Sequence, residues 1–200
     1  MKQLLQNIKT GKTTVAEVPI PNPGQGTALV QTQASLISAG TERMLVNFAK
    51  QGLLGKAKSR PDLVQQMLSK ARREGLFTTI DAAMNKLDEP LALGYSSAGR
   101  IAQLGPGLRG YRSGERVACA GGGYAVHAEF AAIPQNLMVR IPDSVDFDQA
   151  AFATLGAIAM QGFRLADVQV GAKVAVIGLG LLGLLTVGIS VAAGCQVLGV

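Results

Sequence analysis

The sequence is poor in the residues that build metal centres and disulfide frameworks. Its 200 residues contain two cysteines, one histidine and no tryptophan. Cys119 and Cys195 lie 76 positions apart, and neither belongs to a Cys-x-x-Cys pair. This usage argues against a disulfide framework or a cysteine-rich zinc site, and it is typical of a reducing compartment. No apolar run follows the Met1-Lys2 start, so no secretory signal is expected, and we predict a cytoplasmic protein.

Charge is absent from residues 174–200, a run of 27 residues that is long enough to cross a bilayer as a helix. Six glycines interrupt this run at positions that match turns and a helix end, and no Lys or Arg cluster follows it. We therefore favour a folded domain over a membrane span. The net charge of +6 equals the excess in residues 50–73, where seven basic side chains accompany Asp62. A solvated helical face explains that excess better than a polyanion site, so no nucleic-acid partner is expected.

The uncharged run also carries three glycines at G-x-G-x-x-G spacing after a short β-branched strand, residues 174–177. Gly178 permits a tight turn, Gly180 lets a pyrophosphate approach the backbone, and Gly183 lets the next helix pack close to the strand. That helix is predicted over 181–193 with its N-terminal amides facing the phosphates, and a second parallel strand over 196–200. We expect the strand at 174–177 to be buried on both faces. The predicted cofactor-binding residues are Gly178, Gly180, Leu181, Leu182 and Gly183.

The chain before this unit alternates between strand and helix patterns. Helical spacing after position 43 predicts a helical excursion over 44–89, either a lid or partner surface or a packed ornament. Helical spacing returns over 146–166, after a boundary at Pro142-Asp143. The predicted strands lie at 3–8, 13–18, 28–38, 91–104, 124–133 and 137–141.

Five segments stand out in order along the chain: Val18 to Gly24, Ile37 to Glu42, Leu93 to Gly99, Tyr111 to Val117 and Gly178 to Gly183. Together they resemble the medium-chain dehydrogenase/reductase family, which includes zinc alcohol dehydrogenases and quinone reductases. The resemblance implies a mixed fold, with a GroES-like β-barrel catalytic domain at 1–143 that carries the insertion at 44–89. The start of an α/β Rossmann domain follows at 144–200 and breaks off at Val200. It also implies NAD or NADP as cofactor, a small-molecule substrate and an active site in the cleft between the domains.

The chain departs from the family at the metal positions. Ala39 stands at the family's Cys position, Tyr95 stands at its His position, and Thr154-Leu-Gly156 offers no third Cys. We therefore predict no metal at all, neither a catalytic nor a structural zinc. The insertion most resembles a subgroup in which such a domain is fused ahead of a second, sugar-oxidoreductase-like domain, so we expect the chain to continue.

The resemblance also suggests the catalytic residues. Thr41 matches the family's proton-relay hydroxyl, and Glu42 matches an acid that orients its neighbours. Tyr95 either donates a hydrogen bond to the substrate oxygen or fills the space of the absent metal. His127 alternates with apolar residues over 125–129, which predicts a solvent-facing strand residue.

These observations together predict a zinc-independent, NAD(P)-dependent oxidoreductase that acts on a carbonyl, an alcohol or an activated alkene, with a sugar-linked substrate as one option. The alternative is a catalytically inactive dinucleotide-binding sensor or scaffold. The residue that distinguishes NAD from NADP is expected about 20 residues past the glycines, beyond Val200. The sequence determines neither the substrate nor the oligomeric state, and a homo-oligomer is one option.

Overall fold

The computed structural model describes residues 1–8, 10–50 and 89–200, which fall into two compact units. The first unit comprises Met1–Pro19 and Ile37–Leu93, and the second comprises Ile20–Leu36 and Gly94–Val200. Most of the insertion predicted at 44–89 lies outside the described residues, and positions 44–50 continue a helix that begins at Ala39. The predicted domain boundary after residue 143 stays a prediction.

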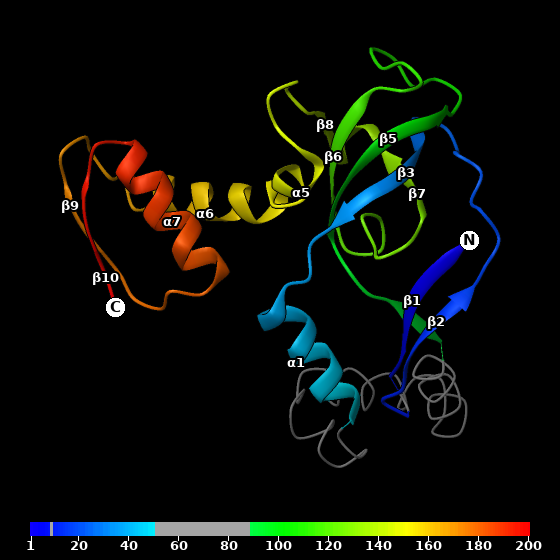
Figure 1. Ribbon diagram of the computed structural model, residues 1–200, viewed down its shortest axis with the longest axis horizontal. Coiled ribbons are helices and arrows are strands. Elements are labelled where there is room, and N and C mark those ends of the chain that lie inside the picture. Colours follow the sequence, from blue (N-terminus) through cyan, green and yellow to red (C-terminus); the bar gives the residue numbers. More distant parts are fainter. Residues whose placement is uncertain (9, 51–88) are drawn as a thin grey trace, which may run out of the picture. The chain divides into compact units, whose positions relative to one another are not determined.

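The first unit contains a three-stranded antiparallel sheet and one helix. Its strands are β1 (Lys2–Asn7), β2 (Thr13–Glu17) and β4 (Pro90–Ala92), in the order β2-β1-β4. The hairpin between β1 and β2 closes where Asn7 and Lys12 hydrogen-bond through their backbones at 2.9 Å. Helix α1 (Ala39–Lys50) contacts β1 (Figure 1). The two strands predicted at 3–8 and 13–18 are thus confirmed to within one residue.

The second unit is organised around a five-stranded antiparallel sheet with the order β7-β3-β5-β6-β8 (Figure 1). The strands contribute alternate residues to one apolar core. Four of these residues are each at most 1% exposed: Val30, Ile101, Val117 and Ile133. The strands are β3 (Thr27–Ser35), β5 (Ser96–Leu104), β6 (Arg116–Ala120), β7 (Phe130–Pro134) and β8 (Met138–Arg140), with a 3-10 turn, η1 (Gln135–Leu137), before β8.

Two of the predicted strands are wrong in extent. The strand expected over 91–104 is broken after β4, because Gly94 has a φ of +96° that an extended strand does not adopt. The strand expected over 124–133 is mostly a loop, and only β7 at its end joins the sheet. In both segments buried apolar residues continue beyond the strands, since Leu93, Ala125 and Val126 are buried but lie outside β4, β5 and β7.

Arginine side chains fix the segment that leads from β8 to the following helices, α5 (Phe147–Ala150) and α6 (Ala153–Leu165). Arg116 donates hydrogen bonds to the backbone oxygens of Asp143, at 3.3 Å, and Val145. Its guanidinium lies 4.8 Å from the ring centroid of Phe147, and that of Arg100 lies 5.4 Å from the same centroid. The helical stretch predicted at 146–166 consists of these two helices, with Ala151 and Phe152 between them.

The C-terminal part of the second unit is a β-α-β arrangement. It consists of β9 (Lys173–Val176), α7 (Leu181–Ala192) and β10 (Gln196–Gly199), and the two strands pair in parallel. Helix α7 contacts both strands and α6 (Figure 1). The expected order of strand, turn, helix and parallel strand is confirmed, so the fold class is mixed as predicted.

Burial of the first parallel strand differs from expectation. Only Val176 of β9 is buried, and Ile177, which follows the strand, is 87% exposed. A parallel strand is covered on both faces only when several strands and helices flank it, and here β10 and α7 are its neighbours. No helix in the described ranges has both the length and the apolar composition that a bilayer crossing requires.

Candidate dinucleotide and active-site residues

The loop between β9 and α7 is shaped by its glycines. Gly178 has a φ of +92°, and its N–H donates to the oxygen of Val200 at 2.8 Å. Gly183 lies in the first turn of α7, and a Cβ added there would sit 1.9 Å from the oxygen of Gly178. Position 183 therefore accepts no side chain while the loop keeps this path. The helix and the loop approach as closely as two backbones can.

The N-terminal end of α7 is open and uncharged. Gly180 precedes the helix with extended backbone angles, and a Cβ added to it would meet no atom within 4 Å. The first turn carries no acidic residue, and the Leu182 side chain is 44% exposed. The first N–H groups of a helix lack partners within the helix, and the helix dipole favours an anion there. The residues at this end therefore fit a pyrophosphate group.

Two of the predicted catalytic residues occupy the first turn of α1. The Glu42 carboxylate is buried, and its Oε1 accepts a hydrogen bond from the Ser38 N–H at 3.1 Å. The hydroxyl of Ser38 lies 3.4 Å from that of Thr41, which is exposed. The helix begins at Ala39 rather than at the predicted position 44, so it includes Thr41 and Glu42.

Tyr95, the third predicted catalytic residue, lies in the bend just before β5. Its backbone oxygen accepts a hydrogen bond from the Gly121 N–H at 2.9 Å, which ties the bend to the loop after β6. The side chain is half-buried, and its hydroxyl makes no hydrogen bond to any described residue. A phenol in this state can donate to a ligand without first breaking a bond within the described chain. Tyr95 belongs to the second unit, whereas Thr41 and Glu42 belong to the first.

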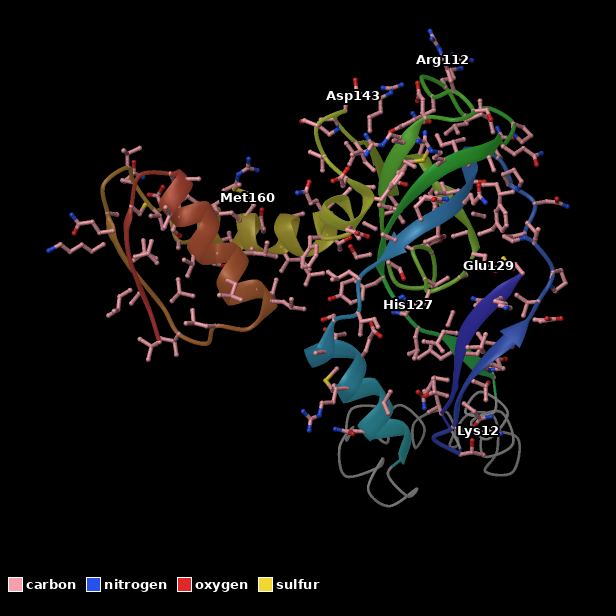
Figure 2. The ribbon with its side chains drawn as sticks, in the orientation of Figure 1. Lys12, Arg112, His127, Glu129, Asp143 and Met160 are labelled. Atoms are coloured by element: carbon pink, nitrogen blue, oxygen red, sulfur yellow. The ribbon has the colours of Figure 1, made fainter. Side chains whose placement is uncertain are left out.

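The prediction for His127 is wrong. This residue lies in the loop between β6 and β7, half-buried, and not on the solvent face of a strand (Figure 2). Its Nδ1 lies 2.9 Å from the Ser35 hydroxyl, and a Cβ added to Gly94 would come within 3.0 Å of its ring. Ser35 is 92 positions away in the chain, so no sequence signal could have linked the two. His127 is thus packed against the residue that precedes Tyr95.

The chain resembles known dehydrogenases in sequence. No family model matches the chain. The (R,R)-butanediol dehydrogenase of Bacillus subtilis is 26% identical over 131 residues, which cover 52% of this chain and 37% of that protein. Further relatives include a sorbitol dehydrogenase and a quinone oxidoreductase. The chain is a homologue of the medium-chain dehydrogenases and reductases.

Solved structures of the alcohol dehydrogenase superfamily share its fold. An alcohol dehydrogenase superfamily protein from Novosphingobium aromaticivorans superposes over 100% of this chain and 52% of its own, with a TM-score of 0.72 and 23% identity. A mycobacterial protein in complex with NADPH superposes over the same shares, with a TM-score of 0.71 and 21% identity. The chain thus spans about half the length of these dehydrogenase-fold proteins.

The residues after Tyr95 form a buried polar cluster with β6 and the residues before α6. The Ser96 hydroxyl is fully buried and donates to the Ala151 oxygen at 2.6 Å. Cys119 lies nearby in β6, where burial raises the pKa of its thiol from 9.0 to about 12 and a hydrogen bond with Ser97 opposes that rise. Burial therefore favours the protonated thiol of Cys119 at neutral pH, which disfavours a role as a nucleophile.

A groove of about 500 Å³ lies between β6, β8 and α6, with Ala120, Met138 and Ile158 among its lining residues. None of the predicted site residues lines it. Within the described part of the chain, no three His, Cys, Asp or Glu side chains come close enough to hold a metal ion. The absence of zinc stays a prediction.

Proposed function

We propose that this chain is part of an NAD(P)-dependent, zinc-independent oxidoreductase that interconverts a carbonyl and an alcohol or reduces an activated alkene. The observation that carries the proposal is the contact between Gly183 and the Gly178 oxygen. Through this contact the N-terminal end of α7 lies beside the tight turn at Gly178, and the space around Gly180 is open. The relatives named as butanediol and sorbitol dehydrogenases and the neighbour that binds NADPH support it. Sugar-linked alcohols are the substrate class to test first, and the choice between NAD and NADP stays open.

Each proposed residue has a distinct task. A bound nicotinamide dinucleotide supplies the hydride chemistry. Gly178, Gly180 and Gly183, with the amides of Leu181 and Leu182, hold its pyrophosphate. The Tyr95 hydroxyl donates a hydrogen bond to the substrate oxygen and thereby stabilises the charge that develops on it.

Proton transfer falls to the first turn of α1. The Thr41 hydroxyl is exposed and passes a proton between the substrate oxygen and solvent. Glu42 acts as a positioning residue, because its carboxylate holds the Ser38 N–H and so fixes the start of the helix that carries Thr41.

The chemistry of the residues at the metal positions supports zinc independence. The family's Cys position holds Ala39 and its His position holds Tyr95, and neither Ala nor a neutral Tyr replaces a thiolate or an imidazole. The proposal further includes a cytoplasmic protein with a small-molecule substrate. It includes neither a nucleic-acid nor a membrane partner, and self-association is left open.

The lost metal donors also favour a second candidate, a dinucleotide-binding sensor or scaffold without catalysis. Two measurements distinguish the candidates. NADH and NADPH are titrated against the protein by nicotinamide fluorescence, and oxidation of the reduced cofactor is followed with sugar-linked and simple carbonyl substrates. We expect binding with turnover, and a turnover loss of at least about 100-fold in the Tyr95→Phe/Thr41→Ala double variant with binding preserved. Binding without turnover, unchanged in the double variant, would establish the sensor instead.

A further inference from the structure

The bend that carries Tyr95 is held on one side by the loop between β6 and β7. The Gly121 N–H donates to the Tyr95 oxygen at 2.9 Å, and this bond continues the pairing of Ser96 with Ala120 by one residue. The Gly121 oxygen in turn accepts the Ala125 N–H at 2.9 Å, which closes the start of the loop on itself. The carbonyl side of Tyr95 is therefore fixed by backbone hydrogen bonds.

The other side of the bend, before Tyr95, packs against His127 of the same loop. Gly94 has a φ of +96°, and a Cβ added there would lie 2.8 Å from the backbone nitrogen of His127 and 3.0 Å from Cγ and Cδ2 of its ring. The Cα of Gly94 thus lies directly against the ring and the backbone of His127. Because glycine adopts more backbone conformations than any other residue, the conformation at Gly94 depends on this neighbour. Gly94 and Tyr95 share a peptide bond, so the contact acts on the backbone of Tyr95 itself.

His127 is in turn tied to the sheet. Its Nδ1 lies 2.9 Å from the hydroxyl of Ser35, the last residue of β3, and its neighbours Val126 and Ala128 are buried. The imidazole therefore connects the end of β3 to Gly94. These contacts use Nδ1, Cγ and Cδ2 of the ring. An asparagine side chain has a Cγ atom and two polar atoms at nearly the same places.

We propose that His127 is a positioning residue for Tyr95. Its imidazole, held by Ser35, supports Gly94 and so sets the direction in which the Tyr95 phenol projects toward the substrate oxygen. This inference rests on the proposed function and deepens it, since it adds a residue that acts through Tyr95.

Turnover of the reduced cofactor is compared in the wild-type protein, His127→Ala and His127→Asn. The alanine variant loses both contacts, and kcat is expected to fall at least about tenfold with a smaller change in KM, because a misplaced donor stabilises the transition state less. Asparagine keeps the atoms that face Gly94 and Ser35, so His127→Asn is expected to stay within about threefold of the wild-type rate. Equal losses in the two variants would overturn the inference, since proton transfer by the imidazole would give that result.

A double-mutant cycle shows whether the effect runs through Tyr95. In the Tyr95→Phe background, His127→Ala is expected to cost less than about twofold, because no phenol hydroxyl remains to be misplaced. A loss of the same size in both backgrounds would indicate a general structural effect and contradict the positioning role. Ser35→Ala is expected to lower kcat more than Gln33→Ala, the matched control at an exposed position of the same strand. Equal rates in these two variants would overturn the part assigned to Ser35.

A measurement on the unliganded protein separates this inference from the proposed function. The chain contains three tyrosines, so labelling with 3-fluorotyrosine gives three fluorine signals, which tyrosine-to-phenylalanine variants assign. The Tyr95 signal is expected to shift in His127→Ala and to return in His127→Asn. The Tyr111 signal should stay in place, because its hydroxyl donates to the Met138 oxygen at 3.0 Å. An unmoved Tyr95 signal would overturn this inference alone. Lack of turnover in the wild-type protein would overturn the proposed function, and the Tyr95 signal would still test the contact with His127.

Discussion

Replacing Gly183 with alanine places a methyl group where the backbone of the glycine loop already lies. The added Cβ would sit 1.9 Å from the Gly178 oxygen and 3.0 Å from its carbonyl carbon. To restore van der Waals contact, the helix or the loop must move by roughly 1.5 Å. The obstacle is backbone, so a change of rotamer cannot relieve it.

A second glycine of the same helix provides the matched control. A Cβ on Gly188 would meet no atom within 4 Å. Both substitutions gain about 0.5–1 kcal/mol because alanine is the better helix former. The difference between the two variants therefore isolates the overlap at position 183, and overpacking of this kind costs about 1–3 kcal/mol.

The measurements are the free energy of unfolding in urea and the dissociation constant for NADH and NADPH. We expect Gly188→Ala to match or exceed the wild-type stability and to bind as the wild type does. Gly183→Ala is expected to be less stable than Gly188→Ala by about 1–3 kcal/mol and to bind at least about tenfold more weakly. Equal stability and equal affinity in the two variants would refute the role assigned to the close approach of α7.

Two further predictions concern the buried cluster near β5. Ser96→Ala leaves the Ala151 oxygen without its hydrogen bond and is expected to lower the free energy of unfolding in urea by about 1–3 kcal/mol. The exposed Ser113 is the control, and Ser113→Ala should lower it by less than about 0.5 kcal/mol. Equal losses in the two variants would contradict the role assigned to Ser96. The Cys119 thiol has a folded-state pKa of about 12 against 9.0 when unfolded, so its contribution is intact below pH 9 and stability falls as the pH rises from 9 toward 12. When urea unfolding is measured at several alkaline pH values, Cys119→Ala should reduce the decline of the free energy of unfolding with pH. An unchanged decline would contradict the effect assigned to the buried thiol.

The parts of the molecule that the sequence predicted well are those that nearby residues determine. Gly178 and Gly183 constrain a stretch of only six residues, and β9, α7 and β10 follow from the residues around them. The hairpin between β1 and β2 likewise depends on the turn at Thr10-Gly11.

The errors concern contacts between distant residues. His127 alternates with Ala125, Val126 and Ala128 in a pattern close to that of a strand, yet all three neighbours are buried. The loop is held by the contact of His127 with the Ser35 hydroxyl and by the packing of the His127 ring against Gly94. Neither contact can be recognised from the local sequence pattern. The hydrogen bond from Ser96 to Ala151 spans 55 residues and was missed for the same reason.

The arginines around Phe147 have a consequence for the conditions under which the fold holds together. The bonds from Arg116 to the backbone before α5 end on carbonyl oxygens, and the guanidinium groups of Arg100 and Arg116 both lie over the ring of Phe147. None of these partners is a carboxylate. The arginine contacts between the sheet and its helices therefore do not depend on the ionisation of an acidic partner, unlike an arginine–carboxylate pair.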